Sequence, residues 1–118
     1  MRLLAESEIF PEYIRFNLSG EFVYDEVLQF VETTRTVAED ANRSRILVDS
    51  RELKGHITES HKYFIGTRIA EVFGSAAKSV LIMREGTVTK LGELAAVNRG
   101  ARFLVTDSED EAFDWLLS

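Results

Sequence analysis

Polar and apolar positions alternate near the start of the chain. Between Glu12 and Leu18 every second residue is apolar, which is the period of a strand with one buried face. A weaker strand from about Leu3 to Phe10 can pair with it as a hairpin, because Pro11 between them favours a turn. A second turn is predicted at Ser19-Gly20, where the alternation ends.

After that turn the apolar spacing changes to three and four residues. This spacing predicts a long amphipathic helix from about Phe22 to Glu39. The segment Arg45 to Ser50 contains a continuous apolar run, which is typical of a central strand buried on both faces. A second helix is expected to begin near Thr58 as its N-cap and to end at Gly74.

The remaining pattern predicts a strand at Ser79 to Met83, a helix at about Val88 to Asn98, a strand at Arg102 to Thr106 and a closing helix from about Ser108. The resulting order is β-β-α-β-α-β-α-β-α. Short connections between buried strands force parallel, right-handed crossovers. We therefore predict an α/β fold with a small, mostly parallel sheet, an antiparallel edge strand and about four helices. No linker or repeat interrupts the chain, so residues 1–118 are predicted to form a single domain.

Composition narrows the classes of function. At 118 residues and 45% hydrophobic, the chain can bury a core without metals or cross-links. It contains no cysteine, which excludes disulfides, thiolate nucleophiles and cysteine-based metal sites. A formal charge of -6 repels phosphate backbones and anionic lipids, so neither nucleic acid nor a membrane surface is expected as a partner. The first ten residues fit neither a signal peptide nor a membrane span, and we expect a cytoplasmic protein with no integral membrane association.

Two stretches carry a family resemblance. They are RILVDSRELKGHITESHKYFIGTRIAEVFG (Arg45 to Gly74) and AVNRGARFLVTDSEDEAFDWL (Ala96 to Leu116). Together they resemble the SpoIIAA-like family of small bacterial domains, which is related in fold to STAS domains. The resemblance implies a STAS-like fold over almost the whole chain. It also implies a non-enzymatic regulatory module that forms a homodimer or binds a protein partner through a helix face.

The same resemblance points to a phosphoacceptor. In anti-sigma factor antagonists of this kind, a serine beside an aspartate at a helix start is phosphorylated by a partner kinase. Here the helix entry reads His56-Ile57-Thr58-Glu59-Ser60 and lacks the Asp-Ser-Ser-Gly form of the family. Thr58 or Ser60 is the positional counterpart, which leaves a phosphorylation-switched antagonist as one alternative. Capping of the helix is the other role for Thr58.

The loops that follow the parallel strands form a second candidate site. In open α/β sheets ligands bind at the carboxyl ends of the strands, where helix N-termini and free backbone groups converge. This rule selects the loops Asp49 to Ser60, Arg84 to Thr89 and Thr106 to Ser108. Their candidate residues for a small apolar (lipid-like) or anionic ligand are Asp49, His56, Arg84 and Thr87.

Two of these residues have structural alternatives. Asp49 can anchor its own loop by accepting hydrogen bonds from backbone N–H groups. Thr87 can cap the helix that follows it. Both alternatives remain open at the level of sequence.

The sequence contains no recognisable catalytic or metal-binding set. His56 and His61 are its two histidines, and their five-residue separation does not give the i, i+4 pair of a zinc helix. No nucleophile is identifiable for either histidine to activate. We therefore expect no metal, no cofactor and no enzymatic activity.

Aromatic residues on the helices, Phe64 among them, are assigned to the core. If Tyr24, Tyr63 or Trp115 were exposed beside other apolar side chains, the patch would indicate a dimer interface or a groove for an acyl chain.

Overall fold

A computed structural model describes residues 2–118 and contains the nine predicted elements in the predicted order. The elements are β1 (Leu3–Ile9), β2 (Ile14–Gly20), α1 (Tyr24–Asp40), β3 (Arg45–Asp49), α2 (Glu59–Phe73), β4 (Lys78–Ile82), α3 (Leu91–Val97), β5 (Arg102–Thr106) and α4 (Glu109–Leu116). Within residues 2–118, no helix is both long enough and apolar enough to cross a bilayer.

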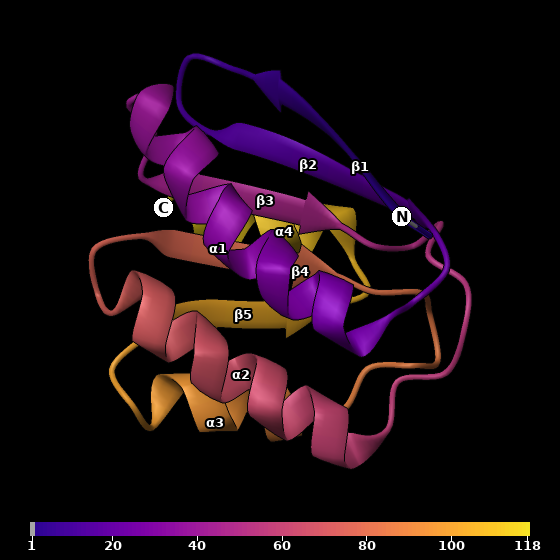
Figure 1. Ribbon diagram of the computed structural model, residues 1–118. Coiled ribbons are helices and arrows are strands. Elements are labelled where there is room, and N and C mark those ends of the chain that lie inside the picture. Colours follow the sequence, from indigo (N-terminus) through magenta and orange to yellow (C-terminus); the bar gives the residue numbers. More distant parts are fainter. Residues whose placement is uncertain (1) are drawn as a thin grey trace.

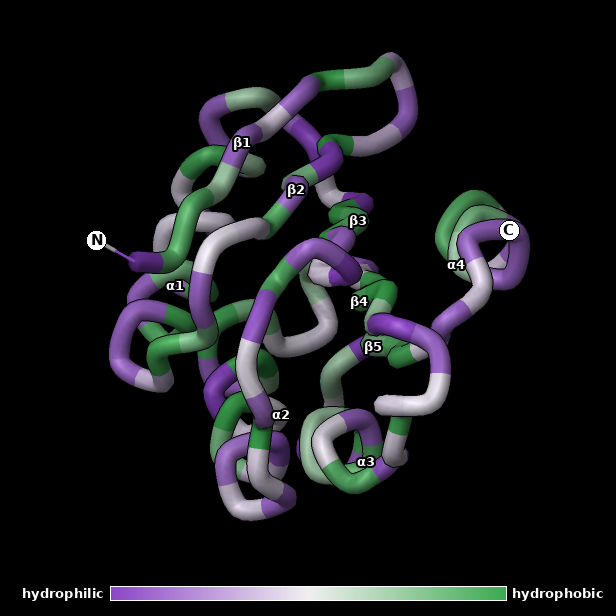
Figure 2. The backbone as a smooth tube through the Cα atoms, turned by 90° about the vertical axis from the view of Figure 1, so that its right-hand side faces the viewer, coloured by the Kyte–Doolittle hydropathy of each residue, from purple (hydrophilic) through white to green (hydrophobic). Residues whose placement is uncertain are grey.

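The strands form one sheet in the order β1-β2-β3-β4-β5. β1 is antiparallel to β2, and every other neighbouring pair is parallel. From β2 to β5 each strand is added next to the previous one at the same edge of the sheet. Right-handed crossovers between them therefore place the connecting helices on one face. Figures 1 and 2 show α1 and α2 on that face with α3 beside α2, whereas α4 lies alone on the opposite face.

The core lies on both faces of the three central strands. Ile46 and Leu47 are adjacent in β3 and both fully buried, which confirms the prediction of a doubly covered strand. Ile46 packs with Phe16 under α1. Leu47 packs with the α4 residues Ala112 and Leu116. The alternation of side chains along each strand thus divides the core into two layers.

Helices α2 and α3 approach each other through two glycines. A Cβ at Gly66 would lie 2.2 Å from the backbone oxygen of Gly92, and a Cβ at Gly92 would lie 2.8 Å from the backbone oxygen of Lys62. Any side chain at either position would therefore overlap the backbone of the other helix. The two glycines fix α2 and α3 as one closely packed pair.

Two predicted boundaries are wrong for local reasons. Ser19 and Gly20 continue β2, because they pair with Leu4 and Leu3 of β1, and the predicted turn comes later. Helix α3 begins at Leu91, since Thr87 closes a separate turn by donating its backbone N–H to the oxygen of Arg84.

The predicted caps at both ends of α2 and the predicted start of α4 are confirmed. The side chain of Thr58 accepts a hydrogen bond from the N–H of His61 at the start of α2. Gly74 ends α2 with φ 53°, a conformation that residues with a Cβ adopt at a cost. Ser108 caps α4 by accepting from the N–H of Glu111.

Candidate functional site

A cavity of about 310 Å³ lies at the carboxyl ends of the strands, between the β3–α2 and β4–α3 connections. Three of the four predicted ligand residues, His56, Arg84 and Thr87, line it together. Its other lining residues are Ser50, Leu53, Gly55, Ile57, Glu59, Lys62, Met83, Gly86 and Thr89. Three of the four predicted residues therefore border one concavity, and their binding of a ligand stays a prediction.

Arg84 holds the two connections together. Its Nη2 donates to the backbone oxygen of Leu53 at 2.6 Å, and its Nε donates to that of Arg51 at 3.4 Å. The hydroxyl of Thr87 donates back to the oxygen of Arg84 at 2.5 Å. Helix α3 has no side-chain cap, so the predicted capping role of Thr87 is wrong. These bonds give the cavity a fixed wall.

Lys62 is a lining residue that the sequence did not reveal. Its Nζ donates to the backbone oxygen of Thr87 and to Oγ1 of Thr89, both at 3.1 Å, and lies 3.3 Å from Oε1 of Glu59. The lining thus carries two cations, Lys62 and Arg84, against the one carboxylate of Glu59. This balance suits a small anion more than a cation.

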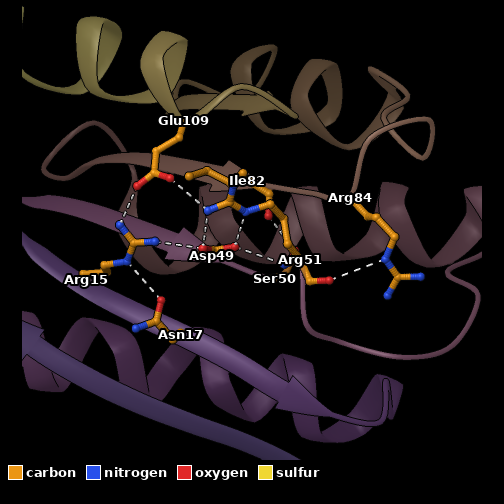
Figure 3. A network of polar contacts seen from close by, with 8 residues as sticks. All are labelled: Arg15, Asn17, Asp49, Ser50, Arg51, Ile82, Arg84 and Glu109. Atoms are coloured by element: carbon orange, nitrogen blue, oxygen red, sulfur yellow. Dashed lines mark hydrogen bonds and ion pairs between the residues drawn. The ribbon is translucent and has the colours of Figure 1, made fainter.

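Asp49 does not line the cavity but belongs to a separate ion network. Figure 3 shows its carboxylate between two guanidinium groups, with Oδ2 2.8 Å from Nη2 of Arg15 and 2.7 Å from Nη2 of Arg51. Glu109, the first residue of α4, completes the network by accepting from Arg15 at 3.1 Å and from Arg51 at 3.0 Å. The network joins β2, β3 and the start of α4.

The network also explains the role of Asp49 in its loop. Oδ1 of Asp49 accepts a hydrogen bond from the backbone N–H of Arg51 at 3.1 Å. Asp49 therefore anchors its own loop, which is the structural role that the sequence offered for it. Burial raises the pKa of the Asp49 carboxyl, but hydrogen bonds from Arg51 and the charges of Arg51 and Arg15 outweigh it and lower the pKa overall. Hydrogen bonds from Arg15 and Arg51 likewise lower the pKa of Glu109, and those from Asp49 and Glu109 raise the pKa of Arg51.

The two hydroxyls at the entry of α2 differ in their surroundings. The hydroxyl oxygen of Thr58 accepts the capping bond from His61 at 3.1 Å. Ser60 lies exposed in the first turn of α2. The ring of His61 stacks on that of Tyr24 with centroids 4.3 Å apart. Residues 2–118 contain no group of three or more His, Cys, Asp or Glu side chains placed to hold a metal ion.

Four large apolar side chains are exposed on α2 and α3. Leu91, Leu94 and Val97, spaced three apart on α3, are 38%, 52% and 45% exposed, and Phe64 on α2 is 51% exposed. The assignment of Phe64 to the core is therefore wrong. Tyr63 is half-buried, with its ring edge-on to Phe64 and its hydroxyl 2.7 Å from Nη2 of Arg99. We call the four exposed residues the α2–α3 apolar face.

Comparison with known proteins identifies the fold. The chain is similar to an anti-sigma factor antagonist from Mycobacterium paratuberculosis, with a TM-score of 0.67 and 12% identity over 98% of this chain and 95% of the other. It is similar to SpoIIAA in its unphosphorylated form, with a TM-score of 0.58 and 20% identity over 94% of each chain. An uncharacterised protein with a SpoIIAA-like fold from Shewanella loihica matches with a TM-score of 0.57 and 17% identity over 97% and 93%.

These likenesses show that the chain has the SpoIIAA-like, STAS-type fold, as the sequence predicted. A scan of the sequence against protein-family models finds no match. A search of curated proteins finds none either.

Proposed function

We propose that the protein is a non-enzymatic regulatory module that binds a protein partner, or a second copy of itself, through the α2–α3 apolar face. The observation that carries this proposal is the exposure of Phe64, Leu91, Leu94 and Val97 on one pair of helices. Leu91, Leu94 and Val97 follow one another along one side of α3, and a row of exposed apolar side chains of this kind is typical of protein interfaces. The fold supports the proposal, since two structures that share it are anti-sigma factor antagonists.

The packing of the two helices favours such a role. The Gly66–Gly92 contact leaves little freedom for α2 to move against α3. A partner that buries the apolar face therefore meets a preformed surface and orders few side chains on binding. Leu94 and Phe64 are the expected anchors, because they expose the largest fractions within the face.

Charge introduction by substitution tests the proposal. We expect Phe64→Lys with Leu94→Lys to abolish partner retention from a host extract, or self-association in sedimentation velocity, without lowering the Tm. Leu4→Lys is the matched control, because Leu4 is equally exposed on β1, outside the α2–α3 pair. Retention and self-association that survive the double substitution, or that Leu4→Lys removes instead, would overturn the proposal.

A second candidate function is the binding of a small anionic ligand in the cavity. The observation that favours it is the convergence of His56, Arg84, Thr87 and Lys62 on one space of about 310 Å³. In a native mass spectrum of protein from its own host we expect a non-covalent adduct that His56→Ala weakens. Glu52→Ala, on the same loop but outside the lining, should leave the adduct unchanged. A spectrum without an adduct would count against this candidate.

A phosphorylation switch at the entry of α2 is a further candidate, and Ser60 is the preferred acceptor over Thr58. Both residues are exposed, so the preference follows from the use of the Thr58 hydroxyl as a cap. A phosphate near the start of α2 would interact favourably with the helix dipole. Intact-mass analysis of host protein should show a phosphoryl shift that Ser60→Ala removes and Thr58→Ser retains. Loss of the shift only in Thr58→Ala would assign it to Thr58.

A further inference from the structure

A second, smaller space adjoins the cavity between α2, α3 and the sheet. Its volume is about 50 Å³. Ile57, Lys62, Met83 and Thr89 line both spaces, so the two are neighbours. The rest of its wall is apolar or glycine and consists of Ile65, Gly66, Leu81, Gly92, Phe103 and Val105. We call it the inner space.

The cavity itself is polar at its rim and apolar at its floor. His56 and Arg84 on the rim are exposed. On the floor Leu53 and Met83 are only 7% and 8% exposed, and Ile57 is half-buried. An inorganic anion has no apolar part to place on such a floor. A ligand with one charged end and one apolar end matches both surfaces.

One positive charge of the lining has no negative partner. Nζ of Lys62 and Oε1 of Glu59 lie 3.3 Å apart, so these two charges offset each other. Within residues 2–118 Arg84 takes part in no ion pair, and its Nη1 donates no hydrogen bond. Figure 3 shows both terminal nitrogens of Arg84 pointing away from the Asp49 network. A guanidinium with free N–H groups is well suited to a single carboxylate.

We propose that the cavity and the inner space together bind a small monocarboxylate with a short aliphatic chain. The proposal rests on the anion-binding candidate function of this cavity and adds the class of ligand. The carboxylate lies at Nη1 of Arg84 beside His56, and the chain runs past Ile57 and Met83 into the inner space. One water-sized atom needs roughly 10–15 Å³, so the inner space holds only the last few carbon atoms of a chain.

Three small molecules separate the charge from the chain. Acetate carries the charge without the chain, hexanol carries the chain without the charge, and hexanoate carries both. In amide NMR titrations at constant pH and ionic strength, we expect hexanoate to shift the signals of Ile57, Met83 and Val105. Each buried CH₂ group should lower the Kd about fourfold. Hexanoate should therefore bind about tenfold or more tightly than acetate, because two buried groups suffice for that difference.

Two substitutions with matched controls test the two ends of the ligand. Val105→Ile adds a CH₂ group to the wall of the inner space and should weaken hexanoate but not acetate. Val37→Ile on α1, outside both spaces, should change neither. Arg84→Gln should remove the preference for hexanoate over hexanol. Arg102→Gln, which removes an exposed cation from β5 outside the lining, should keep that preference.

The outcomes distinguish this proposal from the function on which it rests. Equal affinities for acetate and hexanoate, with shifts confined to His56 and Arg84, would leave an anion site but overturn the class of ligand. Hexanol that binds as tightly as hexanoate, or hexanoate binding that Val105→Ile leaves undiminished, would also overturn it. Unshifted signals with all three molecules would overturn both the class of ligand and the anion-binding function.

Discussion

Replacement of Asp49 by asparagine probes the ion network that ties α4 to the sheet. The carboxylate is 13% exposed and accepts four hydrogen bonds, from Nη2 of Arg15 and from Nη2, Nε and the backbone N–H of Arg51. The asparagine side chain would keep one acceptor oxygen, lose the charge and turn an NH₂ group toward a guanidinium. The substitution therefore removes attraction and adds an unfavourable contact.

The expected loss follows from these contacts. A hydrogen bond to a charged group contributes about 1.5–3 kcal/mol. Asp49→Asn loses two such hydrogen bonds. Arg51 and Glu109 are more exposed, so solvent screens their charges and reduces the contribution of these ion pairs to stability. We expect the free energy of unfolding in urea to fall by about 2 kcal/mol at pH 7, with an unchanged m-value.

The pH dependence has a definite sign. Because the folded protein lowers the pKa of Asp49, its contribution to stability is present above the ordinary carboxyl pKa and is lost as the pH falls through the folded pKa. The difference between wild type and Asp49→Asn should thus be complete at pH 7 and shrink below about pH 4. Asp107→Asn, an exposed control, should change stability by less than about 0.5 kcal/mol. A difference that stays constant from pH 7 to pH 3 would refute the electrostatic reasoning.

Three further substitutions test the packing, a cap and a buried charge. Gly66→Ala should cost about 2–3 kcal/mol, because its methyl group overlaps the backbone of Gly92, and an unchanged Tm would disprove the close contact. In urea, Thr58→Ala should cost about 1 kcal/mol and Ser60→Ala almost nothing, whereas equal losses would contradict the capping role. Lys78→Met should raise stability at neutral pH, since burial and neighbouring arginines lower the pKa of this lysine in the fold. That gain should shrink as the pH rises toward the pKa of lysine in the unfolded chain. A gain that does not change with pH would contradict the explanation by a buried charge.

Local patterns in the sequence were sufficient to predict the order of elements. The apolar run around Ile46 and Leu47 indicated a buried strand, and Thr58 and Gly74 indicated the ends of α2. These signals involve residues that are close in sequence, so they can be recognised without knowledge of the tertiary structure. The turn predicted at Ser19 was wrong, because pairing of Ser19 with Leu4 of β1 outweighed the local turn signal.

The candidate site was only partly predictable, because local patterns do not reveal contacts between residues that are distant in sequence. The strand-end rule located His56, Arg84 and Thr87 in one cavity. It could not supply Lys62, which enters from the first turns of α2, or the pairing of Arg15 with Glu109, which are 94 residues apart. Partners of this kind are set by tertiary packing, which no local spacing encodes.

The exposure of Phe64 was also beyond the sequence pattern. Phe64 lies two residues before Gly66, which contacts α3, so its side chain is on nearly the opposite side of α2 and neither the sheet nor α3 covers it. Sequence spacing predicts which helix face is apolar, but the depth of helix packing determines how much of that face is buried.

Site-specific photo-cross-linking in the native host tests the role of the α2–α3 apolar face most directly. A photoreactive phenylalanine analogue is placed at Leu94 and, in a second strain, at the equally exposed control position Leu4. We predict a discrete cross-linked product, to a protein partner or to a second copy, from position 94 and none from position 4. Cross-linking from position 4 alone, or from neither position, would contradict a protein-binding function for this face.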